Sequence, residues 1–370
     1  MFIQAMKRVT SLFITVFVAS QLLLAQKKND VAVIGYFAGN ATYLDSFPVQ
    51  KLTHLIFSFC HLNGNKLWVS NAGDSACIQK MVSFKEKYPY LKIILSMGGW
   101  GGCKDCSTVF ASDSGRNEFA RSTKELMRYF HTDGIDLDWE YPALPGYPGH
   151  VYSPGDRPNF TLLIRSLRNE LGNKYEISFA AGGFDKFIDS SIEWKEVMRI
   201  ADKVNVMSYD LVHGFSKVSG HHTPLYSTPQ QKQSTDNAVN RLIEAGVPAN
   251  KIIIGAAFYA RMFEVADPAN NGLYDSAHFY RGISYSHLYD SISSQNGFKQ
   301  YWDETANAPY AFNPSRMIEV TYDDSLSIKR KTEYAIKRKL GGIMFWQLVD
   351  DKFNHGLLDV IDKTKREALK

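Results

Sequence analysis

Short apolar runs rich in β-branched residues recur along the chain and alternate with longer segments of helical periodicity. Residues 116–131, 159–171 and 235–245 place apolar side chains three and four positions apart, as amphipathic helices do. Eight apolar runs are predicted to be buried strands: residues 31–37, 54–60, 92–97, 134–140, 177–181, 204–209, 252–258 and 342–347. Strands that alternate with helices predict an α/β fold. The pattern alone permits either a (β/α)8 barrel or a doubly wound sheet.

One interval between strands is too long for a single helix. Residues 261–318 separate the seventh and eighth predicted strands and are rich in Tyr, Phe, Ser, Asn and Gly. A disordered loop is the alternative interpretation, but the aromatic content of the segment argues against it. We therefore predict that this segment folds.

The predicted strand 134–140 carries an acid at every second position. Side chains alternate between the faces of a strand, so Asp136, Asp138 and Glu140 share one face while the apolar residues between them share the other. Carboxyls spaced about 6–7 Å apart repel one another and are costly to bury. A solvated acidic strand face is the alternative, although Asp is depleted in strands. We interpret the row as a functional site.

The composition is that of an ordinary globular protein. The chain has 370 residues, of which 45% are hydrophobic and 22% are charged, which is enough for a large core plus an insertion. Its formal net charge is +4, with charges of both signs interspersed. This near-balance gives no reason to expect nucleic acid or another polyanion as a partner, and it suits a neutral substrate.

The first 25 residues have the features of a secretory signal peptide. Lys7 and Arg8 precede an apolar segment of about 15 residues, and the small Ala25 stands before Gln26. The segment is short for a membrane span, which needs about 20 residues, and an uncleaved anchor is the alternative. Removal of residues 1–25 leaves 40 basic and 38 acidic residues. We expect a secreted or periplasmic monomer, residues 26–370, with no stable membrane insertion after cleavage.

Four cysteines leave more than one pairing open. Cys103 and Cys106 are near enough in sequence to close a tight loop through a disulfide, which secretion permits. A pair of free thiols is one alternative. A zinc site that adds Cys60 and Cys77 is another, but the second pair lacks the C-x-x-C spacing of such sites.

The acidic strand resembles the signature of glycoside hydrolase family 18, the chitinase-like family. The pattern D-x-x-D-x-D-x-E is complete, with Asp133, Asp136, Asp138 and Glu140. Four more segments resemble family landmarks in the expected order: S-M-G-G-W at 96–100, M-S-Y-D at 207–210, Y-D-D at 322–324 and F-W-Q at 345–347. The resemblance covers residues from about 31 to about 359, nearly the whole mature chain.

The resemblance implies a (β/α)8 barrel rather than a doubly wound sheet. It also implies that residues 262–318 form a small α+β insertion between strands 7 and 8. The implied activity is that of a chitinase, which hydrolyses β-1,4 bonds between N-acetylglucosamine units of chitin or chitooligosaccharides with retention. No cofactor is expected, and no metal site, because the sequence has no carboxylate–histidine spacing typical of one.

The resemblance also implies roles for the acids, at the strand ends where such barrels carry their active sites. Glu140 would be the general acid that protonates the glycosidic oxygen. Family 18 uses the 2-acetamido carbonyl of the substrate as nucleophile. Asp138 would hold the acetamido N–H, balance the charge of the oxazolinium ion and share a proton with Asp136. Asp133 is out of phase with the other acids and would be structural.

Other positions that match the family would bind the sugar. Tyr209 would donate a hydrogen bond to the acetamido carbonyl, and Asp210 would support the same sugar. Trp346 would stack beneath the sugar at the cleaved bond, and Met207 would fill the core below it. Five further residues are expected at the rim of the site. Tyr36, Arg261 and Trp100 would contact sugar, with structural packing as the alternative interpretation. Gly98 and Gly99 would let the backbone approach the centre closely.

Two functions other than a chitinase are compatible with the same barrel. A chitin-binding lectin on the same barrel would typically lack Glu140 or Asp138, and both are present. An endo-β-N-acetylglucosaminidase that acts on N-glycans is the other, and the insertion favours chitinase over it. We further expect the insertion to form one wall of a deep cleft, which would favour processive or exo-type cleavage.

Overall fold

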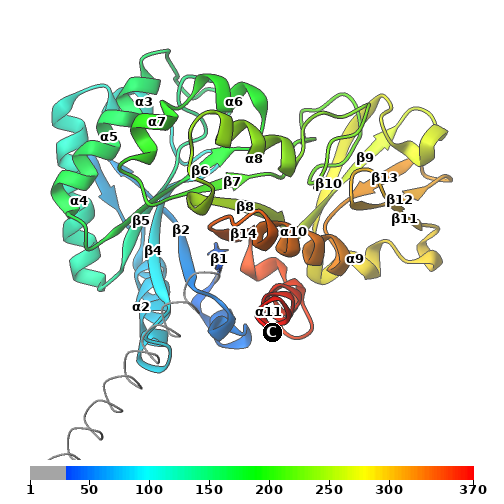
Figure 1. Cartoon of the computed structure of the whole chain (residues 1–370), viewed down its shortest axis with the longest axis horizontal. Coiled ribbons are helices and arrows are strands. Elements are labelled where there is room, and N and C mark those ends of the chain that lie inside the picture. The colour runs from blue at the N-terminus through cyan, green and yellow to red at the C-terminus, as the bar shows by residue number, and fades with distance from the viewer. Residues whose placement is uncertain (1–30) are drawn as a thin grey trace, which may run out of the picture.

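A closed barrel of eight parallel strands dominates residues 31–370, the part of the chain that this computed structural model describes. The strands follow the order β1-β14-β8-β7-β6-β5-β4-β2, and β1 also pairs with β2, which closes the ring (Figure 1). Closure confirms the (β/α)8 fold and excludes the doubly wound sheet. The barrel strands are β1 (Ala32–Phe37), β2 (His54–Asn63), β4 (Lys92–Gly98), β5 (Gly134–Asp138), β6 (Glu176–Gly182), β7 (Lys203–Met207), β8 (Ile252–Ala257) and β14 (Gly342–Trp346).

Helices cover the outside of the barrel, as Figure 1 shows. Caps fix several of their ends: the Ser112 side chain accepts from the N–H of Gly115 at the start of α4, and Asp324 forms a capping box with Ser327 at the start of α10. The helices are α2 (Ala72–Lys87), α3 (Cys106–Phe110), α4 (Asp113–Phe130), α5 (Asp156–Leu171), α6 (Asp185–Ser190), α7 (Trp194–Met198), α8 (Thr235–Glu244), α10 (Ser325–Lys337) and α11 (Leu357–Ala368).

Two strands end earlier than the sequence predicts. β5 ends at Asp138 and β7 at Met207, so Glu140 and Tyr209 each lie two residues past a strand. Beyond Met207 the backbone turns, because the N–H of Ser208 donates to Val206 and Asp210 adopts a φ of 53° that no strand continues. The two functional candidates therefore sit on loop residues directly above the barrel.

The alternation predicted for β5 places its apolar residues outside and its acids inside. Ile135, Leu137 and Trp139 belong to the main hydrophobic core between barrel and helices. Asp136 and Asp138 are buried on the opposite face. The barrel interior also holds a smaller apolar cluster: Ile34, Tyr36, Ile56, Ile94, Tyr209, Ile253, Ala257 and Met344.

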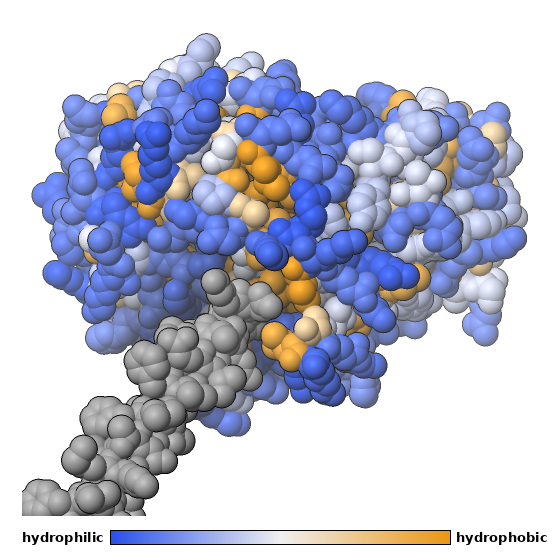
Figure 2. Space-filling model, viewed as in Figure 1, coloured by the Kyte–Doolittle hydropathy of each residue, from blue (hydrophilic) through white to orange (hydrophobic). Residues whose placement is uncertain are grey.

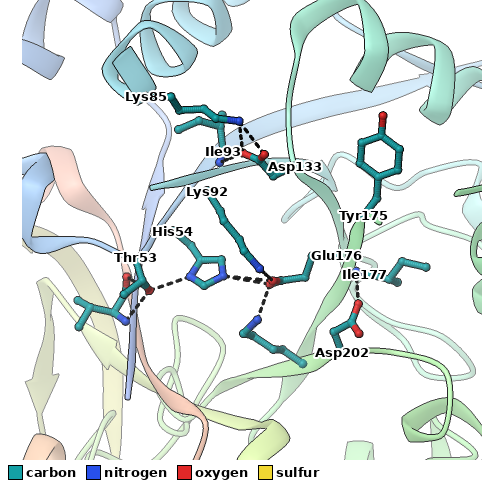
Figure 3. Close-up of polar contacts among 12 residues, drawn as sticks. Thr53, His54, Lys85, Lys92, Ile93, Asp133, Tyr175, Glu176, Ile177 and Asp202 are labelled. Carbon is teal, nitrogen blue, oxygen red and sulfur yellow. Dashed lines mark hydrogen bonds and ion pairs between the residues drawn. The ribbon is translucent and has the colours of Figure 1, made fainter. Parts of the chain in front are cut away.

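The amino ends of the strands are closed by an ion network centred on Glu176 (Figure 3). Its carboxylate lies 2.7 Å from the ammonium groups of Lys92 and Lys203 and 3.2 Å from His54 Nε2. Nearby, Asp133 accepts from Lys85 at 2.6 Å and from the N–H of Ile93 at 2.8 Å. These contacts join the starts of four strands at the end opposite Glu140, where barrels of this class carry stability rather than chemistry.

A second, antiparallel sheet follows β8 and lies beside the barrel (Figure 1). Its order is β10-β9-β13-β12-β11, with the bounds β9 (Tyr259–Val265), β10 (Ala277–Ser284), β11 (Lys299–Asp303), β12 (Ala308–Asn313) and β13 (Ile318–Thr321), and α9 (Tyr285–Ser291) packs at its end. Met262, Ile318 and Val320 belong to the same hydrophobic core as the barrel helices. The insertion thus shares its core with the barrel.

The remaining features concern the cysteines and the surface. Cys103 and Cys106 form a disulfide with a Cα–Cα distance of 5.3 Å, so their sulfurs are not available as zinc ligands, while Cys60 and Cys77 are buried free thiols. One β3 strand (Lys66–Trp68) extends β2 as a hairpin. The face in Figure 2 is mostly hydrophilic. Among the helices of residues 31–370, none has the length and apolar character needed to cross a membrane.

Candidate active site

Asp136 lies deepest in the acidic row and accepts four hydrogen bonds. Tyr36 Oη and Ser96 Oγ donate to Oδ2 at 3.0 and 2.9 Å, while Ser178 Oγ and Asn205 Nδ2 donate to Oδ1 at 2.7 and 3.0 Å. Burial raises the pKa of Asp136, and these donors limit the rise because they stabilise the ionised form. Asp136 is therefore a fixed acceptor anchored by four strands.

Asp138 lies one pleat above, in register with Gly98, and is only 5% exposed. Its Oδ1 has no hydrogen-bond partner within residues 31–370. Burial raises the pKa of Asp138 well above its usual value, and the nearby Glu140 and Asp136 raise it further. A buried, unpartnered carboxyl oxygen at the carboxyl end of a barrel strand is ready to accept a hydrogen bond from a bound ligand.

Glu140 follows at the rim and keeps part of its surface open to solvent. The surrounding protein desolvates the carboxyl and raises the pKa of Glu140 to about 7; the negative charge of Asp210 adds to the rise and a hydrogen bond with Tyr141 opposes it. A carboxyl with this pKa is largely protonated below neutral pH, so it can donate a proton where an ordinary Glu cannot.

Asp210 is held in the opposite protonation state. Arg261 donates to its two oxygens through Nε and Nη2, each at 2.7 Å, and His222 Nδ1 lies 3.6 Å from Oδ1. Burial alone would raise the pKa of Asp210, but His222 and Arg261 outweigh burial and hold the pKa well below its usual value. The guanidinium of Arg261 also lies 5.0 Å from the ring centre of Tyr259.

Aromatic rings surround the carboxyls. Trp346 stacks on Phe59 with ring centres 5.5 Å apart at 14°, and its ring centre lies 6.0 Å from that of Tyr36. Tyr209 is buried, with its hydroxyl 3.9 Å from the sulfur of Met344. Burial raises the pKa of Tyr209, so its hydroxyl keeps its proton and can donate.

Residues 32–351 match the protein family described as glycosyl hydrolases family 18. The chain belongs to this family.

Individual relatives agree with the family assignment. Chitinase A1 of Niallia circulans is 33% identical over 300 residues, which are 74% of this chain and 43% of that protein, so the chain spans less than half of this relative. A solved family 18 N-acetylglucosaminidase from Paenibacillus barengoltzii is 35% identical, with a TM-score of 0.82, over 90% of this chain and all of that one. The Group IV chitinase of Ostrinia furnacalis in complex with allosamidin is 25% identical, with a TM-score of 0.84, over 91% and 99% of the two chains.

The paired glycines of this family 18 chain allow two close approaches at the rim. A Cβ on Gly98 (φ 112°) would lie 2.2 Å from the carbonyl oxygen of Asp138, and one on Gly99 (φ 79°) would lie 2.3 Å from the ring of Phe59. Any side chain at either position would displace the acidic strand or the aromatic ring on which Trp346 stacks.

Trp100 follows these glycines and is 49% exposed. Its ring centre lies 5.7 Å from Tyr147 and 6.4 Å from Phe215, which come from two other loops. A pocket of about 460 Å³ opens beside Trp100 and is lined by Phe59, His61, Leu62, Gly98, Trp100, Gly101, Gly102, Lys104, Asp105 and Tyr147. The ring of Trp100 is thus partly open rather than packed inside its loop.

Sequence reasoning missed several residues of the candidate site. Ser178 and Asn205 bind Asp136, and each is a polar residue at an inward position of an otherwise apolar strand, which is a signal that could have found them. Alternation along β2 would place Phe59 on the outer face with Phe57, and the register shift between Ser58 and Cys60 changes that direction, while Tyr147 and Phe215 lie on irregular loops without periodicity. Met207, which the sequence placed below the sugar, packs against the apolar cluster of the barrel interior. His221 Nε2 lies 3.0 Å from Oδ2 of Asp303, a residue of the insertion.

Proposed function

We propose that the protein is a chitinase that cleaves β-1,4-linked N-acetylglucosamine chains by substrate-assisted catalysis. The observation that supports this most is a pair of neighbouring carboxyls with complementary abilities. Glu140, whose pKa is raised to about 7, can donate a proton, and Asp138 below it keeps an oxygen free to accept a hydrogen bond. The relatives named chitinase support the same substrate class.

The reaction begins with a proton transfer from Glu140 to the glycosidic oxygen. As the C1–O bond breaks, the acetamido carbonyl oxygen of the same sugar bonds to C1 and closes an oxazolinium ring. Asp138 passes its proton to Asp136, accepts the acetamido N–H and balances the positive charge, and the hydroxyl of Tyr209 donates to the acetamido oxygen. Water then adds at C1 on the face from which the leaving group departed, Glu140 takes its proton, and the configuration is retained.

Substrate assistance is favoured over a protein nucleophile by the state of Asp210. A two-carboxylate glycosidase needs a second free carboxylate at the reacting carbon. Asp210 is committed to Arg261 through two hydrogen bonds, and Asp136 is buried beneath Asp138 with four donors. Asp138 is the remaining carboxyl, and we assign its free oxygen to the acetamido N–H. The acetamido group of the substrate then supplies the nucleophile.

The sugar would rest on aromatic surfaces at the barrel mouth. Trp346, supported by Phe59, would stack beneath the sugar at the cleaved bond, and Trp100 with Phe215 would contact neighbouring sugars. Arg261, Tyr36 and the glycine pair would shape the site rather than react. We also propose that residues 1–25 are cleaved and that the mature chain acts outside the cytoplasm as a monomer.

Product analysis tests the proposal. Purified residues 26–370 are incubated with chitooligosaccharides of two to six units and, separately, with an N-glycosylated protein. We expect cleavage of the chitooligosaccharides with the β-anomer formed first. Release of N-glycans without cleavage of chitooligosaccharides would replace the chitinase by an endo-β-N-acetylglucosaminidase, and binding of chitin without any cleavage would leave a lectin. Release of single sugars only would match the name of the Paenibacillus barengoltzii relative.

A further inference from the structure

A buried lysine and aspartate lie directly behind the site, and the proposed chemistry uses neither. Lys331 in α10 and Asp323 before it are both fully enclosed, and Lys331 Nζ lies 2.6 Å from Asp323 Oδ2. Burial of an ion pair costs desolvation energy that apolar residues would avoid. A contribution to stability alone therefore does not explain why this pair is buried here.

Thr223 links this pair to the segment that carries Tyr209. Lys331 Nζ donates to Thr223 Oγ1 at 2.5 Å, and Thr223 Oγ1 lies 3.3 Å from the carbonyl oxygen of Ser208. Ser208 is the residue before Tyr209, and its own hydroxyl exchanges two hydrogen bonds of 3.0 Å with the backbone of Gly255. The Thr223 hydroxyl also lies 3.2 Å from Asp323 Oδ2, so its proton can go to either acceptor. Ser208 is therefore contacted by Thr223 at its carbonyl and by β8 at its hydroxyl.

Asp323 links the same pair to the segment that carries Arg261. Its Oδ2 accepts from the N–H of Ala257 at 3.0 Å, the last residue of β8 and two residues before Tyr259. Its Oδ1 accepts from Ser327 Oγ at 2.6 Å, which ties it to the start of α10. The buried cluster of Thr223, Asp323 and Lys331 thus contacts both chain segments whose side chains form the Asp210–Arg261 pair.

We propose that Thr223, Asp323 and Lys331 are positioning residues that hold the backbone of Tyr209 and Asp210 in the geometry needed for cleavage. This inference rests on the proposed function. The three residues are buried behind the strands, so they act through Tyr209 and Asp210 and not on the sugar. Because Thr223 is uncharged, its hydroxyl can be removed without changing the net charge near Glu140.

The test compares two changes of one side chain. Thr223→Val keeps the shape and removes the hydroxyl, while Thr223→Ser keeps the hydroxyl and removes the methyl group. Small misplacement of a binding group costs turnover, so we expect kcat of Thr223→Val on chitooligosaccharides to fall about 10-fold or more. Thr223→Ser should retain kcat near the wild-type value. KM should change little in either variant.

The result that would overturn the inference is wild-type kcat in Thr223→Val, or equal losses in both variants. If Thr223→Val does not fold, Thr223→Ala gives the same comparison against Thr223→Ser. Failure of the proposed function is a separate outcome, since wild-type protein would then not cleave chitooligosaccharides at all. In that case crystal structures of the two variants still test the positioning role, because only loss of the hydroxyl should displace Tyr209 and Asp210.

Discussion

Arg261 donates to both carboxylate oxygens of Asp210 at 2.7 Å, although 51 residues separate the two in sequence. The pair joins β9 of the insertion to the loop after β7 of the barrel. It also fixes Asp210 in its ionised form close to Glu140, where its negative charge adds to the effect of burial on the pKa of Glu140. The strand that leads into the insertion therefore supplies the cation that keeps Asp210 ionised beside Glu140.

The first prediction concerns the pH dependence of turnover. The proposed mechanism needs Glu140 in its protonated form, so kcat/KM should be high below a pKa of about 7 and fall as pH rises through it. Asp210→Asn removes a negative charge and leaves Arg261 unpaired, and both changes favour ionised Glu140. The alkaline limb should therefore move to lower pH. Glu333→Gln, on the outer helix α10, is the control and should leave the limb in place. An unchanged or raised limb in Asp210→Asn would contradict the assignment.

The second prediction separates the acids of the D-x-x-D-x-D-x-E row. Glu140→Gln should keep the fold and the affinity for chitooligosaccharides, measured by calorimetry, while turnover falls by roughly 10²–10⁴-fold or more, because no proton donor remains. Asp133→Asn is the matched control. Asp133 binds Lys85 and the N–H of Ile93 at the opposite end of the strand. Its loss should lower the melting temperature and leave turnover per folded molecule intact. Near-wild-type turnover in Glu140→Gln would show that another group is the acid.

The third prediction concerns the charge that forms during the reaction. Asp138→Asn keeps the size of the side chain but cannot balance an oxazolinium ion, so turnover should fall severely. A thiazoline analogue of the cyclised intermediate should inhibit the wild type and lose more affinity in Asp138→Asn than intact substrate does. Mass spectrometry of trapped enzyme supplies the opposite outcome: a sugar bound covalently to an Asp or Glu side chain would rule out substrate assistance.

Local sequence patterns predicted the part of the site that lies on one strand. Asp136 and Asp138 alternate with apolar residues, so their inward direction follows from the pleat alone. Ser178 and Asn205 complete the same cluster from 42 and 69 residues away, and although each stands out as a polar residue in an apolar strand, only the closed barrel brings it to Asp136. The end of β7 was placed two residues late because the chain turns after Met207, through the Ser208 N–H to Val206 hydrogen bond and the positive φ of Asp210, although its apolar run continues to Tyr209.

The insertion shows the same limit at a larger scale. Aromatic content predicted that residues 262–318 fold, but not that Met262 and Val320 would share a core with the barrel. That sharing depends on which face of β9 and β13 meets the helices, and this is decided by tertiary packing. It also means that excising the whole insertion would expose barrel core, so single substitutions are the better probes of its function.

The fourth prediction uses a buried acid within the insertion. Glu319 is fully buried in β13 between Phe263 and Phe312, and neither carboxylate oxygen has a partner within residues 31–370. Burial raises the pKa of Glu319 well above its usual value. The folded state then binds a proton more tightly than the unfolded state, whose Glu pKa is about 4.3. Stability should therefore be lost as pH rises above that value, by up to about 1.4 kcal/mol per pH unit.

Glu319→Gln removes this titration. Denaturant unfolding at pH 4 and at pH 8 should show the Gln variant gaining stability relative to the wild type as pH rises. Glu333→Gln again serves as the control, since Glu333 is only partly buried and lies 3.3 Å from Arg330, and no such gain is expected. A constant difference between Glu319→Gln and the wild type across this pH range would mean that Glu319 does not titrate differently in the folded protein.

The fifth prediction tests whether the insertion contacts the sugar chain. Phe279 on β10 is 36% exposed, and the guanidinium of Arg261 lies 5.5 Å from its ring centre. A Cβ on Gly214, next to the exposed Phe215, would lie 3.5 Å from the same ring. Phe279 is thus placed between the Asp210–Arg261 pair and an exposed aromatic of the barrel loop, where it can stack on a sugar beyond the cleaved bond.

Phe279→Ala should therefore weaken binding of five- and six-unit chitooligosaccharides by about 1 kcal/mol, or roughly fivefold, and change binding of two-unit ones little. Measurement in the Glu140→Gln background prevents cleavage during titration. Tyr129→Ala is the control, since Tyr129 is 70% exposed near the end of α4, which leads into the amino end of β5 and so lies away from the acids. A loss of affinity that is the same for every oligomer length, or no loss, would show that this side of the insertion is structural and forms no wall of the binding site.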